Sequence, residues 1–444
     1  MKRKIRVIYL RLILSSGYQT FKRAMAEIRR RLTFRRHVIH VFLQIDDPYS
    51  YLLSHYLQFV KENYKVELRI YLSQALRSDF MPEPEMLTEY AARDSKMLAE
   101  ELGIPFLDKG DTPAVEHRRA LLDFLGEEHT DREFQETMHA ALSVYWRGDI
   151  EGAARLVTHS KPDQSETNIL ISKNQLLLRK LGHYSSAMML YAGEWYWGVD
   201  RLIYLCDRLD TLRARRGSEP VPELQSLAQA MQLNLPAAVP ECSKNLPAMD
   251  MYHSFRSPYS YIALKRLFDI SDAFGMKLEI KPILPMVMRG APVPGKKLLY
   301  IVKDANREAR RLKIPFGNLC DPIGVGVDRC MATFYYAKSQ GKEREFVLSV
   351  GSGVWAEGID VATDEGLRVV TERCGLFWPD VVEAIADDSW RETVRENRDS
   401  LTELGLWGVP NIIIGSAAFW GQDRDWLIAR QIEDMCDVGD GILV

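Results

Sequence analysis

Two copies of one heptapeptide hold the residues of this chain whose types and positions could do chemistry. Ser257 opens Ser-Pro-Tyr-Ser-Tyr-Ile-Ala, and Asp47 opens Asp-Pro-Tyr-Ser-Tyr-Leu-Leu 210 residues earlier. Each copy follows an apolar, strand-like run, and its proline favours the first position of a helix. The residue before the proline is then the helix N-cap, where N–H groups and the helix dipole stabilise anions, thiolates included. Ser257 is therefore either a simple cap or a hydroxyl that lowers the pKa of a bound thiolate.

Two segments near the C-terminus could complete such a site. Gly408-Val409-Pro410 precedes an apolar strand. A cis-proline there would let the residue before it offer its backbone to a peptide-like ligand, although strands also open with ordinary prolines. Trp420-Gly-Gln-Asp-Arg424 places a carboxylate at the start of a helix. That carboxylate either complements the helix dipole or accepts a ligand ammonium group.

The repeat extends well beyond the heptapeptide. Further matches occur in the same order at offsets of 210, 209 and 223 residues: Leu102–Phe106 with Leu312–Phe316, Trp146 with Trp355, and Trp197–Arg201 with Trp420–Arg424. Such ordered matches predict duplication of a whole domain. The change in offset predicts about 14 extra residues in the second copy.

Hydrophobic periodicity predicts the same elements in both copies. The first copy has strands at 38–44, 66–72, 187–191 and 194–197, helices at 49–63 and from 199, and a helical block at 84–182. The second has strands at 249–255, 277–283, 411–415 and 417–420, helices at 259–270 and from 423, and a helical block at 296–406. The fold class is therefore α/β, with two tandem thioredoxin-like domains that each contain a helical insertion. We predict an arm at 1–37, domains at 38–212 and 248–444, and a proline-rich linker at 213–247.

Composition and charge limit the kinds of binding partner that the chain could have. The 444 residues are 46% hydrophobic and 27% charged, which is typical of globular proteins. Residues 1–37 hold 12 Lys or Arg and one acid, about +11, so an overall charge of −3 leaves about −14 on the remainder. That acidic remainder argues against a nucleic-acid groove. Within 1–36, apolar residues at helical spacing predict a basic amphipathic helix that lies on an anionic membrane surface or packs on the first domain.

The six cysteines show no Cys-x-x-Cys pair, and no cluster has metal-ligand spacing. Dithiol–disulfide exchange at the heptapeptides is excluded, because neither copy contains a cysteine. Sparse cysteines without a pattern indicate a reducing, cytoplasmic compartment, in which each thiol behaves as a small buried hydrophobe. The basic arm would then provide any peripheral attachment to a membrane.

Residues 252–263, 354–358, 408–410 and 419–424 together resemble 2-hydroxychromene-2-carboxylate isomerases and kappa-class glutathione transferases. These families belong to the DsbA-like branch of the thioredoxin superfamily, and the resemblance covers roughly 248–435. It implies that glutathione is the cofactor. The implied contacts are Ser257 with the sulfur, Val409 before Pro410 with the cysteinyl part, Gln422 and Asp423 with the γ-glutamyl end, and Lys297 with the glycyl carboxylate. Met288 or Arg289 stands at the position of an asparagine-type contact of the family, and Arg289 or Lys297 is expected to substitute for that contact.

The first domain resembles these families more weakly. Asp47 stands at the serine position, where an anion would repel a thiolate. The Gly-x-Pro position is assigned to Gly182-His183-Tyr184, which has no proline. We interpret this domain as a degenerate copy that packs against the second one.

The leading functional hypothesis is a glutathione-dependent isomerase or transferase for a small unsaturated or aromatic substrate. The alternative is a non-catalytic thioredoxin-like binding or scaffold protein that the basic arm recruits to a membrane.

Overall fold

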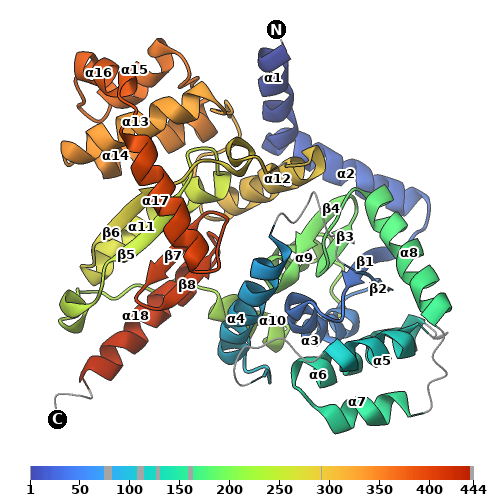
Figure 1. Cartoon of the computed structure of the whole chain (residues 1–444). Coiled ribbons are helices and arrows are strands. Elements are labelled where there is room, and N and C mark those ends of the chain that lie inside the picture. The colour runs from blue at the N-terminus through green and yellow to red at the C-terminus, as the bar shows by residue number, and fades with distance from the viewer. Residues whose placement is uncertain are drawn as a thin grey trace. The chain divides into compact units, whose positions relative to one another are not determined.

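The computed structural model describes residues 2–74, 83–107, 115–126, 131–158, 164–291 and 293–440 (Figure 1). Its contacts divide the chain into two compact units. The N-terminal unit is Lys22–Gln232, and the C-terminal unit combines Met1–Phe21 with Leu233–Val444. Each unit is built around its own sheet.

The N-terminal unit contains a four-stranded sheet in the order β2-β1-β3-β4. Its strands are β1 (His37–Leu43), β2 (Val66–Leu72), β3 (Met188–Tyr191) and β4 (Glu194–Trp197). β1 pairs with β2 in parallel and with β3 antiparallel, and β3 and β4 form a hairpin. The helices of this unit, after the shared helix α2 (Ser16–Leu32), are α3 (Pro48–Asn63), α4 (Pro84–Leu102), α5 (Val115–Leu125), α6 (Asp131–Trp146), α7 (Ile150–Val157), α8 (Gln164–Leu181), α9 (Gly198–Thr211) and α10 (Pro222–Ala230).

The C-terminal unit has the equivalent sheet, in the order β6-β5-β7-β8 and with the same parallel and antiparallel pairs. Its strands are β5 (Met249–His253), β6 (Leu278–Pro282), β7 (Asn411–Ile414) and β8 (Ala417–Trp420). Its α-helices are α1 (Lys2–Leu14), α11 (Pro258–Phe274), α12 (Gly295–Arg311), α13 (Val325–Ser339), α14 (Glu343–Ser352), α15 (Asp364–Glu372), α16 (Trp378–Ala386), α17 (Trp390–Glu403) and α18 (Asp425–Asp440). Short helical turns occur at η1 (Cys242–Asn245), η2 (Met286–Arg289) and η3 (Gly353–Glu357).

This mixed α/β architecture is the predicted one, and the strands lie within two residues of their predicted ends. Helix α11 runs four residues past its predicted end, and α18 begins two residues later than expected. In each sheet the two inner strands are the most buried, and Ile39, Val41 and Met251 are fully enclosed. Burial of these apolar side chains from both faces stabilises the sheet that carries the first helix.

Strand register corrects one prediction. Phe42 pairs with Met188 in the N-terminal unit, and Tyr252 pairs with Asn411 in the C-terminal unit. Met188 therefore occupies the place of Asn411, and the segment 185–187 occupies the place of 408–410. The earlier assignment of 182–184 to that place is wrong by three residues, because it followed a glycine rather than the strand. The absence of proline there still holds, since residues 185–187 read Ser-Ser-Ala.

The polar side chains that follow the first residue of each heptapeptide make the same hydrogen bonds in both units. In the C-terminal unit these bonds run from Tyr259 Oη to Asp304 Oδ2 (2.9 Å), from Tyr261 Oη to Pro315 O (2.8 Å) and from Ser254 N to Ser260 Oγ (3.5 Å). In the N-terminal unit they run from Tyr49 Oη to Asp94 Oδ2 (2.7 Å), from Tyr51 Oη to Pro105 O and from Gln44 N to Ser50 Oγ (3.1 Å). These bonds tie the turn to the preceding strand and to the helical insertion.

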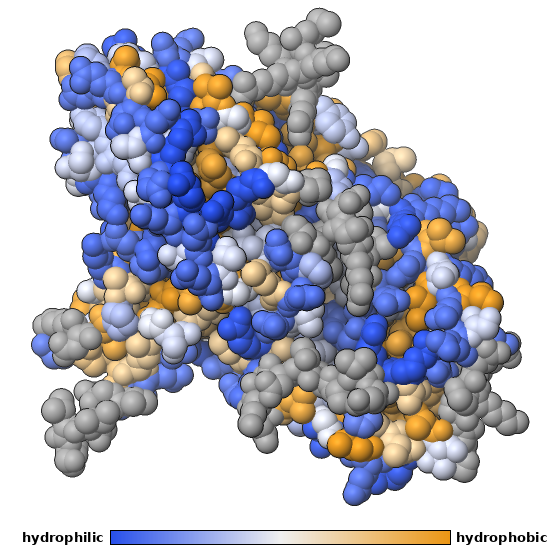
Figure 2. All heavy atoms as spheres, in the orientation of Figure 1, coloured by the Kyte–Doolittle hydropathy of each residue, from blue (hydrophilic) through white to orange (hydrophobic). Residues whose placement is uncertain are grey.

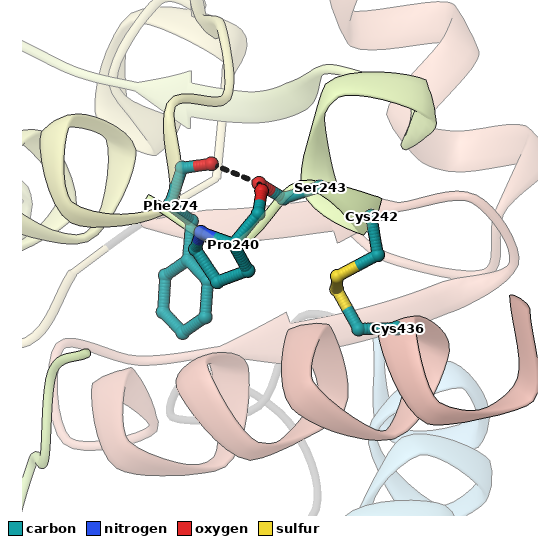
Figure 3. The surroundings of a disulfide bond; sticks show 5 residues. All are labelled: Pro240, Cys242, Ser243, Phe274 and Cys436. Atoms are coloured by element: carbon teal, nitrogen blue, oxygen red, sulfur yellow. Dashed lines mark hydrogen bonds between the residues drawn. A yellow bond between two sulfur atoms is a disulfide. The ribbon is translucent and has the colours of Figure 1, made fainter. Parts of the chain in front are cut away.

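The expectation that all six cysteines are unpaired is wrong for two of them. Cys242 in η1 and Cys436 in α18 form a disulfide, with a Cα–Cα distance of 5.3 Å (Figure 3). The Ser243 hydroxyl beside it bonds to the carbonyl groups of Pro240 and Phe274 and so anchors η1. The two cysteines are 194 residues apart. No local spacing could have predicted their pairing.

The other four cysteines are buried thiols, as expected. Burial raises the pKa of Cys206 to about 12 and also raises the pKa values of Cys330 and Cys374. A thiol with a raised pKa is a poor nucleophile near neutral pH, because the thiolate is the reactive form.

Hydrophilic residues predominate on the face shown in Figure 2, and hydrophobic ones form separate patches there. Among the described residues, no helix combines the length and the apolar character needed to cross a bilayer. The same residues include no group of three or more His, Cys, Asp or Glu arranged to hold a metal ion.

We predict that Tyr259→Phe lowers the free energy of unfolding by about 1–3 kcal/mol, because it leaves the buried Asp304 short of a donor. Tyr336→Phe is the matched control, since its hydroxyl bonds to the exposed Asp380, and it should cost under about 0.5 kcal/mol. Urea unfolding followed by tryptophan fluorescence measures both variants. Equal losses would show that the Tyr259 bond does not hold the turn.

Candidate functional site

The N-terminus of α11 faces the loop that precedes β7. Ser257 is the N-cap of α11, and its Oγ accepts a hydrogen bond from Ser260 N at 3.1 Å. The same hydroxyl lies 3.5 Å from the carbonyl oxygen of Val409, a long contact for an O–H donor. The Val409–Pro410 peptide bond is cis, which decides between the two alternatives that the sequence left open. The predicted cap and the predicted proline loop therefore meet.

Gly408 allows this loop to pass close to an indole ring. A Cβ atom on Gly408 would lie 2.0 Å from Cζ2 of Trp420, so only glycine fits. The rings of Trp407 and Trp420 also pack edge to face, with centroids 5.0 Å apart. The half-buried Val409 follows, and its N–H has no hydrogen-bond partner among the described residues. A ligand with a backbone-like carbonyl could accept from this N–H.

The segment after β8 lies beside the same loop. Gly421 N donates to Pro410 O at 3.0 Å, which fixes the next two residues near the proline. Gln422 is 4% exposed, and its Nε2 has no partner within the described residues. An unpaired buried amide is costly, so this donor suits a polar ligand atom. Asp423 is more exposed, and its Oδ1 lies 3.6 Å from Arg424 Nη1.

Two cationic side chains approach Trp407. Lys297, in the first turn of α12, has its Nζ 5.8 Å from the centroid of the Trp407 ring, and burial lowers its pKa to about 8. Arg289 donates from Nη2 to the Trp407 carbonyl at 2.9 Å. Arg289, one of the two residues expected to substitute for the family's asparagine-type contact, thus reaches the loop. Sequence reasoning missed Trp407, although it directly precedes the Gly-Val-Pro segment.

His253 is a second residue that sequence reasoning missed. It ends β5, is 3% exposed, and neither of its ring nitrogens has a partner in the described part of the chain. Burial lowers its pKa to about 3, so it is neutral at physiological pH. It therefore supplies no positive charge behind the cap. The helix N-terminus and the Ser257 hydroxyl remain the groups at this position that favour an anion.

The corresponding place in the N-terminal unit is already filled by a carboxyl group. Asp47 caps α3, accepting from Tyr49 N at 3.2 Å and from Ser50 Oγ at 2.6 Å. Burial raises the pKa of Asp47 to about 6, against the opposing effect of hydrogen bonds that include one from Ser186. Ala187 stands where the other unit has the cis-proline. Above pH 6 an anionic cap would repel a thiolate.

Comparison with known proteins identifies relatives of part of the chain. Residues 248–433 match the family model of the DSBA-like thioredoxin domain. A 2-hydroxychromene-2-carboxylate isomerase from Sphingobium xenophagum is 27% identical over 184 residues, which is 40% of this chain and 93% of that protein. Glutathione S-transferase kappa 1 from Homo sapiens is 20% identical over 201 residues, 41% of this chain and 89% of that protein. A solved 2-hydroxychromene-2-carboxylate isomerase matches with 24% identity and a TM-score of 0.39, over 44% of this chain and 99% of that one.

We predict that Gly408→Ala displaces the loop or the Trp420 ring and lowers the free energy of unfolding by about 1–3 kcal/mol, as overpacking does. Near-ultraviolet circular dichroism should also change, because the paired indoles of Trp407 and Trp420 shift. Gly295→Ala is the control, since its Cβ would meet no atom within 4 Å. An unaltered spectrum and stability for Gly408→Ala would contradict the close approach.

Proposed function

Because residues 248–433 match the family model of the DSBA-like thioredoxin domain, we propose that the C-terminal unit is a glutathione-dependent isomerase or transferase for a small unsaturated or aromatic substrate. The observation that carries the proposal is the position of Ser257. Its hydroxyl stands at a helix N-terminus and faces the backbone of Val409 beside a cis-proline. That arrangement suits a thiolate attached to a peptide.

The residues around the loop fit a glutathione molecule. The unpartnered N–H of Val409 suits the cysteinyl part, and the buried Gln422 amide suits a carboxylate oxygen. Asp423 would receive the γ-glutamyl ammonium group. Lys297 and Arg289, which both approach Trp407, would bind the glycyl carboxylate. A charged ligand with groups of both signs matches this arrangement.

When bound, glutathione supplies a thiolate nucleophile that can add reversibly to an unsaturated substrate. The chain's own part is to keep that sulfur anionic. Ser257 can turn its proton from Val409 to the sulfur at little cost, because the contact that it gives up is 3.5 Å long. The dipole of α11 acts in the same direction. Trp407 and Trp420 then limit the access of water to this side of the loop.

The N-terminal unit is, in our proposal, a duplicated copy that has lost the glutathione site. Matching strand order, matching register and the repeated tyrosine and serine hydrogen bonds support the duplication. The buried Asp47 carboxyl and the missing proline support the loss of binding. A chain in which neither unit binds glutathione would instead be the scaffold protein considered above.

Calorimetry with glutathione tests the proposal. We expect one molecule bound per chain, because the cap of the N-terminal unit is a carboxyl group. Asp47→Asn, which removes the charge of that cap, should leave the stoichiometry at one, since the cis-proline is still missing. A stoichiometry near two would contradict the assignment of the N-terminal unit, and no binding at millimolar glutathione would favour the scaffold alternative.

Ser257→Ala should raise the pKa of bound glutathione by about one to two units, because a charge-assisted hydrogen bond is worth about 1.5–3 kcal/mol. Thiol-dependent turnover should slow in parallel. Ultraviolet titration of the thiolate, near 240 nm, measures the shift. A loss of stability in this variant does not distinguish a helix cap from a thiolate-binding hydroxyl, since removing a serine cap alone costs about 1 kcal/mol. Ser339→Ala, which removes an exposed hydroxyl at the end of α13, is the control. An equal thiol pKa in wild type and Ser257→Ala would leave Ser257 as a cap only.

A further inference from the structure

Helix α2 presents its apolar side to solvent. Its large apolar residues recur at helical spacing, and all are exposed: Tyr18 38%, Phe21 63%, Met25 49%, Ile28 49% and Leu32 74%. Phe34, just past the helix, is 95% exposed. No residue of α2 is buried. We call the five helical residues the apolar stripe.

The polar side of α2 makes the contacts with the protein. Arg23 donates from Nε and Nη2 to the two carboxylate oxygens of Glu194, each at 2.9 Å. Glu27 accepts from Arg30 and Arg31. Since each residue advances a helix by about 100°, Arg23 and Glu27 lie on the side away from the apolar stripe. This reverses the usual arrangement, in which an amphipathic surface helix turns its apolar side to the core.

The start of α2 is firmly held, so the stripe is part of an ordered helix. Leu14, two residues before α2, is 1% exposed. Its carbonyl accepts hydrogen bonds from Asn306 Nδ2, at 3.1 Å, and from Arg310. Arg310 also donates to Gln19 in the first turn of α2, at 2.8 Å. The arm is therefore docked at this point, and its first helix, α1, packs with the C-terminal unit rather than with the predicted first domain.

The charges beside the stripe are positive. Lys22 and Arg29 flank it on the helix, and Arg35 and Arg36 follow. All four are exposed and form no ion pair with any described residue. Glu27, the one acid of residues 1–37, forms ion pairs with two arginines, which lower its pKa to about 2. A second copy of the chain would bring like charges together if the stripes met, and the pairing would be repelled.

From this geometry we propose that α2 lies in the surface of an anionic lipid bilayer, with the apolar stripe among the acyl chains and the flanking cations among the headgroups. An exposed apolar surface rimmed with basic residues needs a partner that supplies both hydrophobic volume and negative charge, and such a bilayer supplies both. The proposal is independent of glutathione chemistry. It concerns attachment parallel to the membrane surface, not insertion across it.

Sedimentation of the full chain with vesicles tests the proposal. The chain should bind vesicles of phosphatidylcholine with phosphatidylserine more tightly than vesicles of phosphatidylcholine alone. Phe21→Asp together with Ile28→Asp should weaken binding by about tenfold for each side chain. Leu176→Asp is the matched control, since it places the same charge on another exposed leucine, in α8, and should leave binding unchanged. Deletion of the arm is a poorer test, because it removes the buried Leu14.

Charge reversal separates the electrostatic contribution to membrane binding from the hydrophobic contribution. Lys22→Glu with Arg29→Glu should abolish the preference for phosphatidylserine, and raising the salt concentration should weaken binding of the unaltered chain. Circular dichroism checks that each variant is folded. Failure of the unaltered chain to bind phosphatidylserine vesicles at low salt would overturn the proposal. So would equal binding of the stripe variant, or a concentration-dependent dimer that Phe21→Asp dissociates, which would assign the stripe to a second copy.

Discussion

The turn from the first strand into the first helix is the constraint on which each unit depends. Three hydrogen bonds from the heptapeptide fix this turn, and their partners lie on the strand and on the helical insertion. In the C-terminal unit the bond from Tyr259 reaches Asp304 on α12, the helix that also carries Lys297. The position of a candidate ligand cation is thus set by a contact seven residues away along the same helix. The heptapeptide therefore helps to position helix α12, which carries Lys297, as well as the helix cap.

Much of the fold and part of the candidate site could be predicted from the sequence, because these features depend on local signals. The strands follow from apolar runs, the cap from the residue before a proline, and the loop from Gly408-Val409-Pro410. The approach of Lys297 and Arg289 to Trp407 depends on how α12 and η2 pack, which no local pattern specifies. The disulfide and the loop of the N-terminal unit were missed for related reasons. Each depends on strands or segments brought together from far apart in the chain.

Periodicity has a similar limit at the N-terminus. The spacing of Tyr18, Phe21 and Met25 identifies an amphipathic helix, but it does not say which side meets the protein. The ion pair between Arg23 and Glu194 decides that question, and it joins residues 171 apart. The polar contacts at the start and in the middle of the helix involve its polar side, and the apolar side is exposed to solvent. Burial of apolar side chains usually orients an amphipathic helix, but it does not orient α2 here. The apolar side of α2 is therefore available to bind another partner.

The caps of the two units show how far one position can change. A serine cap has a proton to donate, whereas an ionised aspartate cap can only accept, yet both satisfy the same helix terminus. The tyrosines and the second serine hold the turn in either case. A change at this position therefore alters the chemistry of the cap while the turn keeps the same hydrogen bonds. The heptapeptide therefore specifies the shape of the turn, and the residue before the proline has to be inspected separately before any reaction is assigned.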